Sequence, residues 1–100
     1  MVRLAALAAV ILLTACASAP PYEDFALARA AVRAARESEA PRYSPSFWSQ
    51  AEQEYREGEK CYAENAFDEA KKHFQASIKA AEKAENSTRL KKFTSGGGEP

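Results

Sequence analysis

The sequence predicts an all-α protein, a three-helix bundle that follows an N-terminal lipoprotein signal peptide. Three observations lead to this expectation. Residues 4–13 (LAALAAVILL) are unbroken apolar sequence behind a short basic start. Apolar residues then recur every three or four positions in three successive segments, which is the spacing of one helix face. Few β-branched residues follow the apolar run, and no alternating strand pattern competes with the helices.

The N-terminal segment has the layout of a secretory signal. Its apolar run is about half as long as the roughly 20 residues that a membrane-spanning helix needs, and small residues follow it, as at a cleavage point. Leu13-Thr14-Ala15-Cys16 resembles the lipobox of bacterial lipoproteins, in which the cysteine thiol receives a diacylglycerol before cleavage. We therefore expect residues 1–15 to be removed and Cys16 to be lipidated. The alternatives are a buried N-terminal helix, or an ordinary cleavage near Ala15 or Ala17.

Residues 16–22 are the expected tether, and residues 23–93 are the expected helical domain. The first helix, over residues 23–39, is rich in alanine and arginine, which are both strong helix formers. Its apolar stripe consists of Phe25, Ala28, Val32 and Ala35. We expect Pro41 to end this helix and residues 42–45 to be a connector.

The second helix is expected over about residues 47–64, with Ser44 or Ser46 as its N-cap and Pro45 in its opening turn. Its stripe consists of Trp48, Ala51, Tyr55, Gly58 and Tyr62. Asn65 tolerates the left-handed backbone that ends a helix. A third helix is expected from Phe67 to Arg89 or beyond. Residues 94–100 (TSGGGEP) have little to bury, and we expect a disordered tail.

Gly58, Ala70 and Phe74 are expected to form a close-packed seam between the second and third helices. Glycine and alanine let two helix backbones approach closely, and phenylalanine fills the space beside them. Together with residues 65–70 (NAFDEA), this spacing resembles the second half of a tetratricopeptide repeat, whose unit is a pair of antiparallel helices. The resemblance implies a hairpin that presents helix faces to other chains.

A second resemblance covers nearly all of the chain after the lipobox. An Ala-rich helix, then APRYSPSFWSQA (residues 40–51), then FDEAKKHFQASIKAAEKA (residues 67–84) is similar to the domain-of-unknown-function family numbered 4398. That family consists of small envelope lipoproteins of Gram-negative bacteria, and it usually has a glycine where this chain has residues 39–42 (EAPR). The resemblance implies a helical fold and a cell-envelope location, and it implies no activity.

The sequence offers no catalytic motif, and we expect neither a metal nor a cofactor. His73 is the sole histidine and lacks a nucleophile at helical spacing, so we expect it on the surface. The glutamates of the second helix, at positions 52, 54, 57 and 59, are expected to form a solvated face that pairs with lysines of the third helix. With 14 basic and 14 acidic residues, the chain also lacks the basic excess that a nucleic-acid partner requires.

Two further features bear on partners. If Cys16 carries lipid, Cys61 has no partner within its own chain and is either a small buried hydrophobe or the site of an intermolecular disulfide. The aromatic residues exceed what a minimal three-helix core needs, so Tyr43, Trp48 and Tyr55 are candidate anchors for a partner protein. The basic end formed by Arg89, Lys91 and Lys92 suits the helix dipole, and its contact with lipid or peptidoglycan stays open.

Taken together, these features predict a non-enzymatic, lipid-anchored module for protein–protein interaction or scaffolding. We expect it in the outer membrane, facing the periplasm, because Ala17 and Ser18 follow Cys16 without the aspartate that in many such bacteria retains lipoproteins at the inner membrane. The alternatives are a structural envelope lipoprotein that contacts peptidoglycan and a redox-responsive dimer through Cys61.

Overall fold

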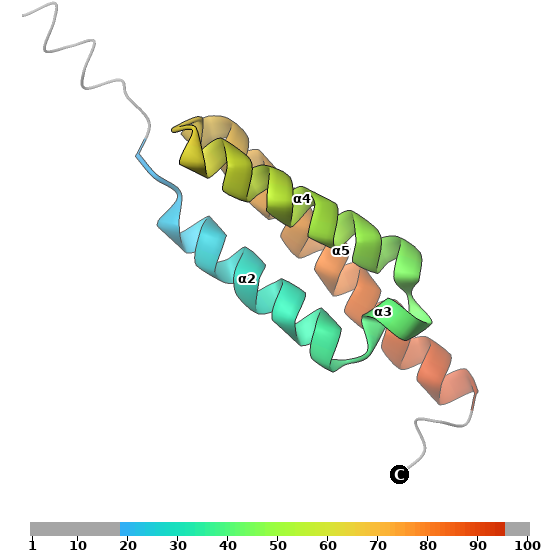
Figure 1. Cartoon of the computed structure of the whole chain (residues 1–100). Coiled ribbons are helices and arrows are strands. Elements are labelled where there is room, and N and C mark those ends of the chain that lie inside the picture. Colours follow the sequence, from blue (N-terminus) through green and yellow to red (C-terminus); the bar gives the residue numbers. More distant parts are fainter. Residues whose placement is uncertain (1–18, 96–100) are drawn as a thin grey trace, which may run out of the picture.

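Four helices make up the part of the chain that the computed structural model describes, residues 19–95 (Figure 1). They are α2 (Tyr22–Glu37), α3 (Ala40–Tyr43), α4 (Pro45–Ala63) and α5 (Phe67–Thr94). The long helices α2, α4 and α5 lie side by side, and short α3 lies at the end of the bundle where the chain passes from α2 to α4. The prediction of an all-α fold built on three long helices is confirmed.

The ends of the predicted domain need adjustment. Tyr22 is the first residue of α2 and not the last residue of the tether, and Phe25 N–H donates to the Pro21 carbonyl at 3.0 Å. Thr94, which we expected in the tail, is the last residue of α5. The predicted signal peptide, Cys16 and residues 96–100 lie outside the described residues.

The segment between α2 and α4 is not the simple connector that we expected. Helix α2 ends at Glu37, and Glu39 then adopts a left-handed backbone with φ of 73°. Pro41 does not end α2, because it lies in the first turn of α3. At this position a backbone N–H has no partner within the helix, so proline costs no hydrogen bond. Residues 40–43 are therefore helical, and the break comes earlier, at Ser38 and Glu39.

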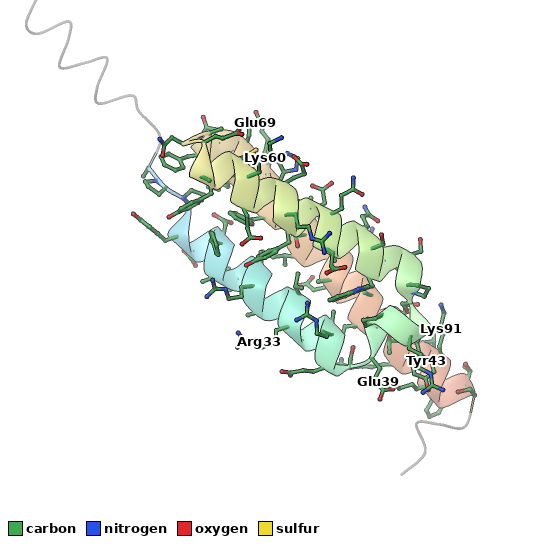
Figure 2. The ribbon with its side chains drawn as sticks, viewed as in Figure 1. Arg33, Glu39, Tyr43, Lys60, Glu69 and Lys91 are labelled. Carbon is green, nitrogen blue, oxygen red and sulfur yellow. The ribbon has the colours of Figure 1, made fainter. Side chains whose placement is uncertain are left out.

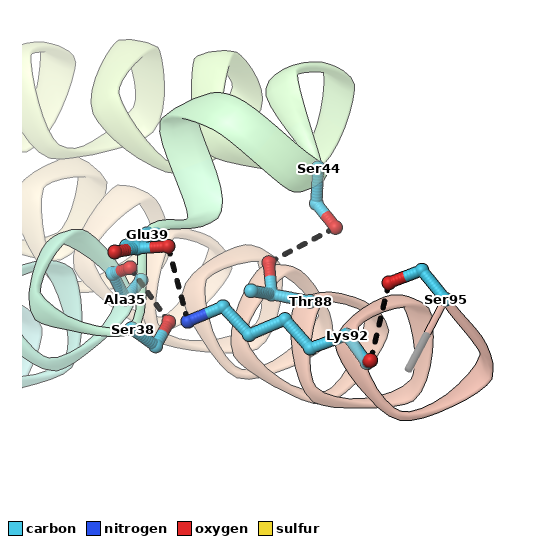
Figure 3. Close-up of polar contacts among 7 residues, drawn as sticks. All are labelled: Ala35, Ser38, Glu39, Ser44, Thr88, Lys92 and Ser95. Atoms are coloured by element: carbon cyan, nitrogen blue, oxygen red, sulfur yellow. Dashed lines mark hydrogen bonds and ion pairs between the residues drawn. The ribbon is translucent and has the colours of Figure 1, made fainter. Parts of the chain in front are cut away.

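Polar contacts fix α3 against the end of α5 (Figure 3). Lys92 Nζ lies 3.3 Å from a Glu39 carboxylate oxygen, and Lys91 Nζ donates to the Tyr43 carbonyl at 2.7 Å. Ser44 stands at the N-cap position of α4, with Pro45 in the first turn as predicted. Its hydroxyl makes no capping bond and instead accepts a hydrogen bond of 3.1 Å from Thr88 Oγ1.

The core is built mainly from alanine. The predicted stripe of α2 is borne out, since Ala28, Val32 and Ala35 are buried and Phe25 packs against the core. The largest fully buried side chain is Phe74, and the fully buried alanines lie on all four helices. A core of such small side chains brings the helix axes close together, so the fit of single side chains decides the packing.

Gly58 and Phe74 meet at the seam between α4 and α5, as predicted. A Cβ placed on Gly58 would lie 2.6 Å from both Cδ1 and Cε1 of Phe74, well inside van der Waals contact. Ala70, the third residue of the seam, is fully buried in the same cluster as Phe74. Glycine is therefore required at position 58 by the space that the Phe74 ring fills.

Two further features position the α4–α5 hairpin. Asn65 has the predicted left-handed backbone, with φ of 61°, and its N–H donates to the Tyr62 carbonyl at 3.1 Å. Across the seam, Ser77 Oγ donates to the Ala51 carbonyl at 2.8 Å. Within residues 19–95, no buried side-chain nitrogen or oxygen lacks a hydrogen-bond partner.

Candidate functional site

The three aromatic residues predicted as partner anchors are half-buried. Trp48 and Tyr55 pack against the core, whereas the Tyr43 ring lies beneath the Arg42 and Lys92 side chains. The Arg36 guanidinium lies over the Trp48 ring at 5.3 Å, and the Tyr55 ring contacts the rings of Phe25 and Phe74 at centroid distances of 6.1 and 6.0 Å. Tyr43 is at the other end of the bundle from the α4–α5 turn, on α3 (Figure 2). The structure does not bring Tyr43, Trp48 and Tyr55 together as one exposed patch.

Aromatic rings also cluster near the start of α2. Phe25 contacts Tyr62 and Phe74 at centroid distances of 5.2 and 4.9 Å, and Tyr22 contacts Tyr62 at 6.2 Å. Partial burial, together with the neighbouring Tyr22 phenol, raises the pKa of Tyr62 above its ordinary value of 10.0. These edge-to-face and tilted contacts attach the first turns of α2 to the hairpin.

Cys61 and His73 are both half-buried and in contact with residues of neighbouring helices. Cys61 is a free, half-buried thiol that packs against the cluster of Ala28, Ala70 and Phe74, which fits the packing role. His73 Nδ1 lies 2.7 Å from a Glu54 carboxylate oxygen, so a histidine makes the polar contact across the hairpin for which we expected lysines. Among the described residues, no lysine of α5 makes an ion pair with α4.

The end of α5 exposes two large apolar side chains that were not among the predicted anchors. Leu90 is 65% exposed and Phe93 is 69% exposed, and their spacing of three residues places them on one helix face. Lys91 and Lys92 turn toward α3 and Thr88 turns into the bundle, so Leu90 and Phe93 face away from both. Their position outside the buried stripe was readable from helical periodicity.

The boundary between α2 and α4 forms a charged groove of about 350 Å³. It is lined by Arg29, Arg33 and Arg36 from α2 and by Glu52, Tyr55, Arg56 and Glu59 from α4, with Val32 at its base. The signal for it in the sequence is the spacing of the α2 arginines, at intervals of four and three residues, which places all three on one face.

Two further properties of the described residues bear on function. Within residues 19–95, no helix is long and apolar enough to cross a membrane. The same part of the chain contains no group of three or more histidine, cysteine, aspartate or glutamate side chains that is arranged to hold a metal ion.

Comparison with known proteins gives one match. The model of the family described as Domain of unknown function (DUF4398) matches residues 23–93, which cover α3 and α4 completely and nearly all of α2 and α5. No curated protein sequence and no solved structure matches the chain significantly. Because the match spans well over half of the sequence and agrees with the helical bundle, the chain belongs to the DUF4398 family.

Proposed function

We propose that the chain is a lipid-anchored helical module of the Gram-negative cell envelope that acts by binding a protein partner and not by catalysis. The observation that carries the partner-binding role is the exposed pair Leu90 and Phe93 in the last turns of α5. Adjacent large apolar side chains on a rigid helix are typical of contact sites, where a few residues supply most of the binding free energy.

The arrangement of the helices suits this role. Helix α2 begins at one end of the bundle and α5 finishes at the other (Figure 1). The 28 residues of α5 span about 42 Å at 1.5 Å per residue. An anchor at Cys16, joined by a tether of about 20 Å at most, would hold the first end near the membrane. Leu90 and Phe93 would then be presented to proteins of the periplasm.

The partner is tested by replacing both apolar residues with serine and crosslinking in the native envelope, followed by mass spectrometry. Leu27→Ser is the matched control, because Leu27 is 52% exposed on α2 and outside the pair. We expect one recurrent protein crosslink in the wild type and in Leu27→Ser, and its loss in the Leu90→Ser/Phe93→Ser variant, which keeps its helicity. Each anchor should contribute about 2 kcal/mol or more to binding.

Two outcomes would contradict this role. Unchanged protein crosslinks in the double variant would place the contact surface elsewhere. Attachment to glycan alone, with no protein crosslink in the wild type, would favour the structural lipoprotein that contacts peptidoglycan.

The anchor is tested separately by labelling cells with palmitate. We expect label in the wild type and in Cys61→Ala, which retains the lipobox, and none in Cys16→Ala. The mature chain should begin at Cys16 and fractionate with the outer membrane, whereas Ala17→Asp should move it to the inner membrane. Label that persists in Cys16→Ala, or a different mature N-terminus, would rule out lipidation at this position.

A further inference from the structure

The groove between α2 and α4 holds more positive charge than packing requires. Arg29, Arg33 and Arg36 follow one face of α2, where like charges at this spacing repel one another and destabilise the helix. The opposite wall supplies Arg56, which lies 3.3 Å from a Glu52 carboxylate oxygen. The four guanidinium groups face only two carboxylates, those of Glu52 and Glu59, so the groove has a positive balance.

Two of the three α2 guanidinium groups lie over aromatic rings and make no ion pair with a described residue. Arg29 lies over the Phe25 ring at 5.4 Å, and Arg36 lies over the Trp48 ring at 5.3 Å. A guanidinium group that lies over a ring keeps its N–H groups able to donate hydrogen bonds. Arg33, on the rim between them, makes no hydrogen bond or ion pair with any described residue (Figure 2 labels it on α2).

The two walls of the groove suit two different groups of a peptide, its side-chain carboxylates and its backbone N–H groups. Guanidinium groups bind carboxylates through paired hydrogen bonds, and Glu52 and Glu59 on the facing wall can accept backbone N–H groups. A dense polyanion such as a polyphosphate offers no donors and would be repelled by these two carboxylates. The spacing also agrees, because Arg29 and Arg33 are about 6 Å apart along the helix and alternate side chains of an extended peptide are about 7 Å apart.

We infer that the groove between α2 and α4 binds an extended acidic peptide segment of another protein. The carboxylates of two acidic residues that are two positions apart in this peptide would bind Arg29 and Arg33. This site is separate from the Leu90 and Phe93 pair. A synthetic peptide tests it without the envelope partner, so either proposal can fail while the other holds.

The chain carries its own reporter for this site. Trp48 is the sole tryptophan, and its ring is in contact with Arg36 at the groove. The experiment titrates the full chain, in a neutral detergent, with an acetylated and amidated peptide of four Glu-Ala repeats, and follows Trp48 fluorescence. The matched peptide has glutamine in place of each glutamate.

We expect a saturable change in fluorescence with the glutamate peptide, weaker at high salt, and none with the glutamine peptide. Arg29→Gln and Arg33→Gln should each weaken binding about fivefold or more, as the loss of one charge-assisted hydrogen bond predicts. Lys79→Gln is the control, because it removes one positive charge from an exposed position of α5 outside the groove. Its affinity should equal that of the wild type.

Three results would overturn the inference. One is the absence of saturable binding of the glutamate peptide. A second is an equal loss of affinity in Lys79→Gln and Arg33→Gln, which would indicate general charge attraction. The third is tighter binding of a polyphosphate of the same charge, which would make the groove a polyanion site.

Discussion

Gly58 and Phe74 show how strongly this small bundle depends on single side chains. The Phe74 ring fills the space where any other residue at position 58 would have a Cβ. Phe74 is fully buried and packs with Ala28 and Ala70, so a shift of its ring would disturb these neighbours. The close approach of α4 and α5 therefore requires both residues together.

Substitution at the seam should destabilise the fold from either side. Alanine favours a helix over glycine by about 1 kcal/mol, yet Gly58→Ala should lower the free energy of unfolding by about 1–3 kcal/mol through overpacking. Phe74→Ala should cost about 3–5 kcal/mol, which is most of the stability of so small a domain. Denaturant unfolding followed by circular dichroism measures both effects.

A combined variant provides the internal control for this seam. Phe74→Leu in the Gly58→Ala background should recover part of the stability, since the smaller side chain makes room for the new Cβ. A Gly58→Ala chain as stable as the wild type, or an unchanged melting temperature for Phe74→Ala, would contradict the packing described here.

Glu39 carries backbone strain at the break between α2 and α3. Its φ of 73° is unfavourable for a residue with a Cβ by about 1–2 kcal/mol, whereas its exposed ion pair with Lys92 contributes at most about 1 kcal/mol. Glu39→Ala and Glu39→Gly both lose the ion pair, but only glycine relieves the strain. Glu39→Gly should therefore exceed Glu39→Ala in unfolding free energy by about 1 kcal/mol, and equal stabilities would refute the strain.

The Tyr62 phenol makes stability sensitive to alkaline pH. Its pKa is raised in the fold, so the folded state retains the proton more firmly than the unfolded chain does. This contribution is complete below the ordinary pKa of 10.0 and is lost as pH rises through the folded-state pKa. The melting temperature of Tyr62→Phe should fall less than that of the wild type above pH 10.0, and parallel declines would contradict the assignment.

Among the elements, α2 buries smaller side chains against the bundle than α4 and α5 bury against each other. Its buried side chains are Ala28, Val32 and Ala35, whereas the hairpin has the Phe74 seam and the Ser77 hydrogen bond to Ala51. We expect the amides of α2 to exchange hydrogen faster than those of α4 and α5, through local opening of α2. Mass spectrometry of exchanged peptides measures this, and equal protection of the three long helices would contradict it.

The helices were predictable from sequence to different degrees. The apolar stripes of α2 and α4 and the Gly58–Phe74 seam follow from helical periodicity and from residue size, and the structure contains them. Helix α3 was missed because Pro41 disfavours a helical residue before it, and only the unusual backbone of Glu39 shows that a new helix begins there. A strained residue of this kind has no reliable signature in a single sequence.

The candidate surfaces were less predictable than the helices. Residue type suggested Tyr43, Trp48 and Tyr55 as anchors, but large aromatic side chains also fill the space between alanine-rich helices, and here Trp48 and Tyr55 pack against the core. The exposure of Leu90 and Phe93 depends on how far α5 extends beside α3. Helical periodicity places both residues outside the buried stripe, but only the fold shows how far the 28 residues of α5 exceed the 19 residues of α4.

At the scale of the whole molecule, the chain is a helical bundle with an anchor expected at one end and the proposed contact surface, Leu90 and Phe93, at the other. A photoreactive phenylalanine analogue at position 93, in the full chain in living cells, tests this most directly, with the same analogue at position 27 as the control. We predict one recurrent protein adduct from position 93 and none from position 27. No protein adduct from position 93, or the same adducts from both positions, would contradict the account.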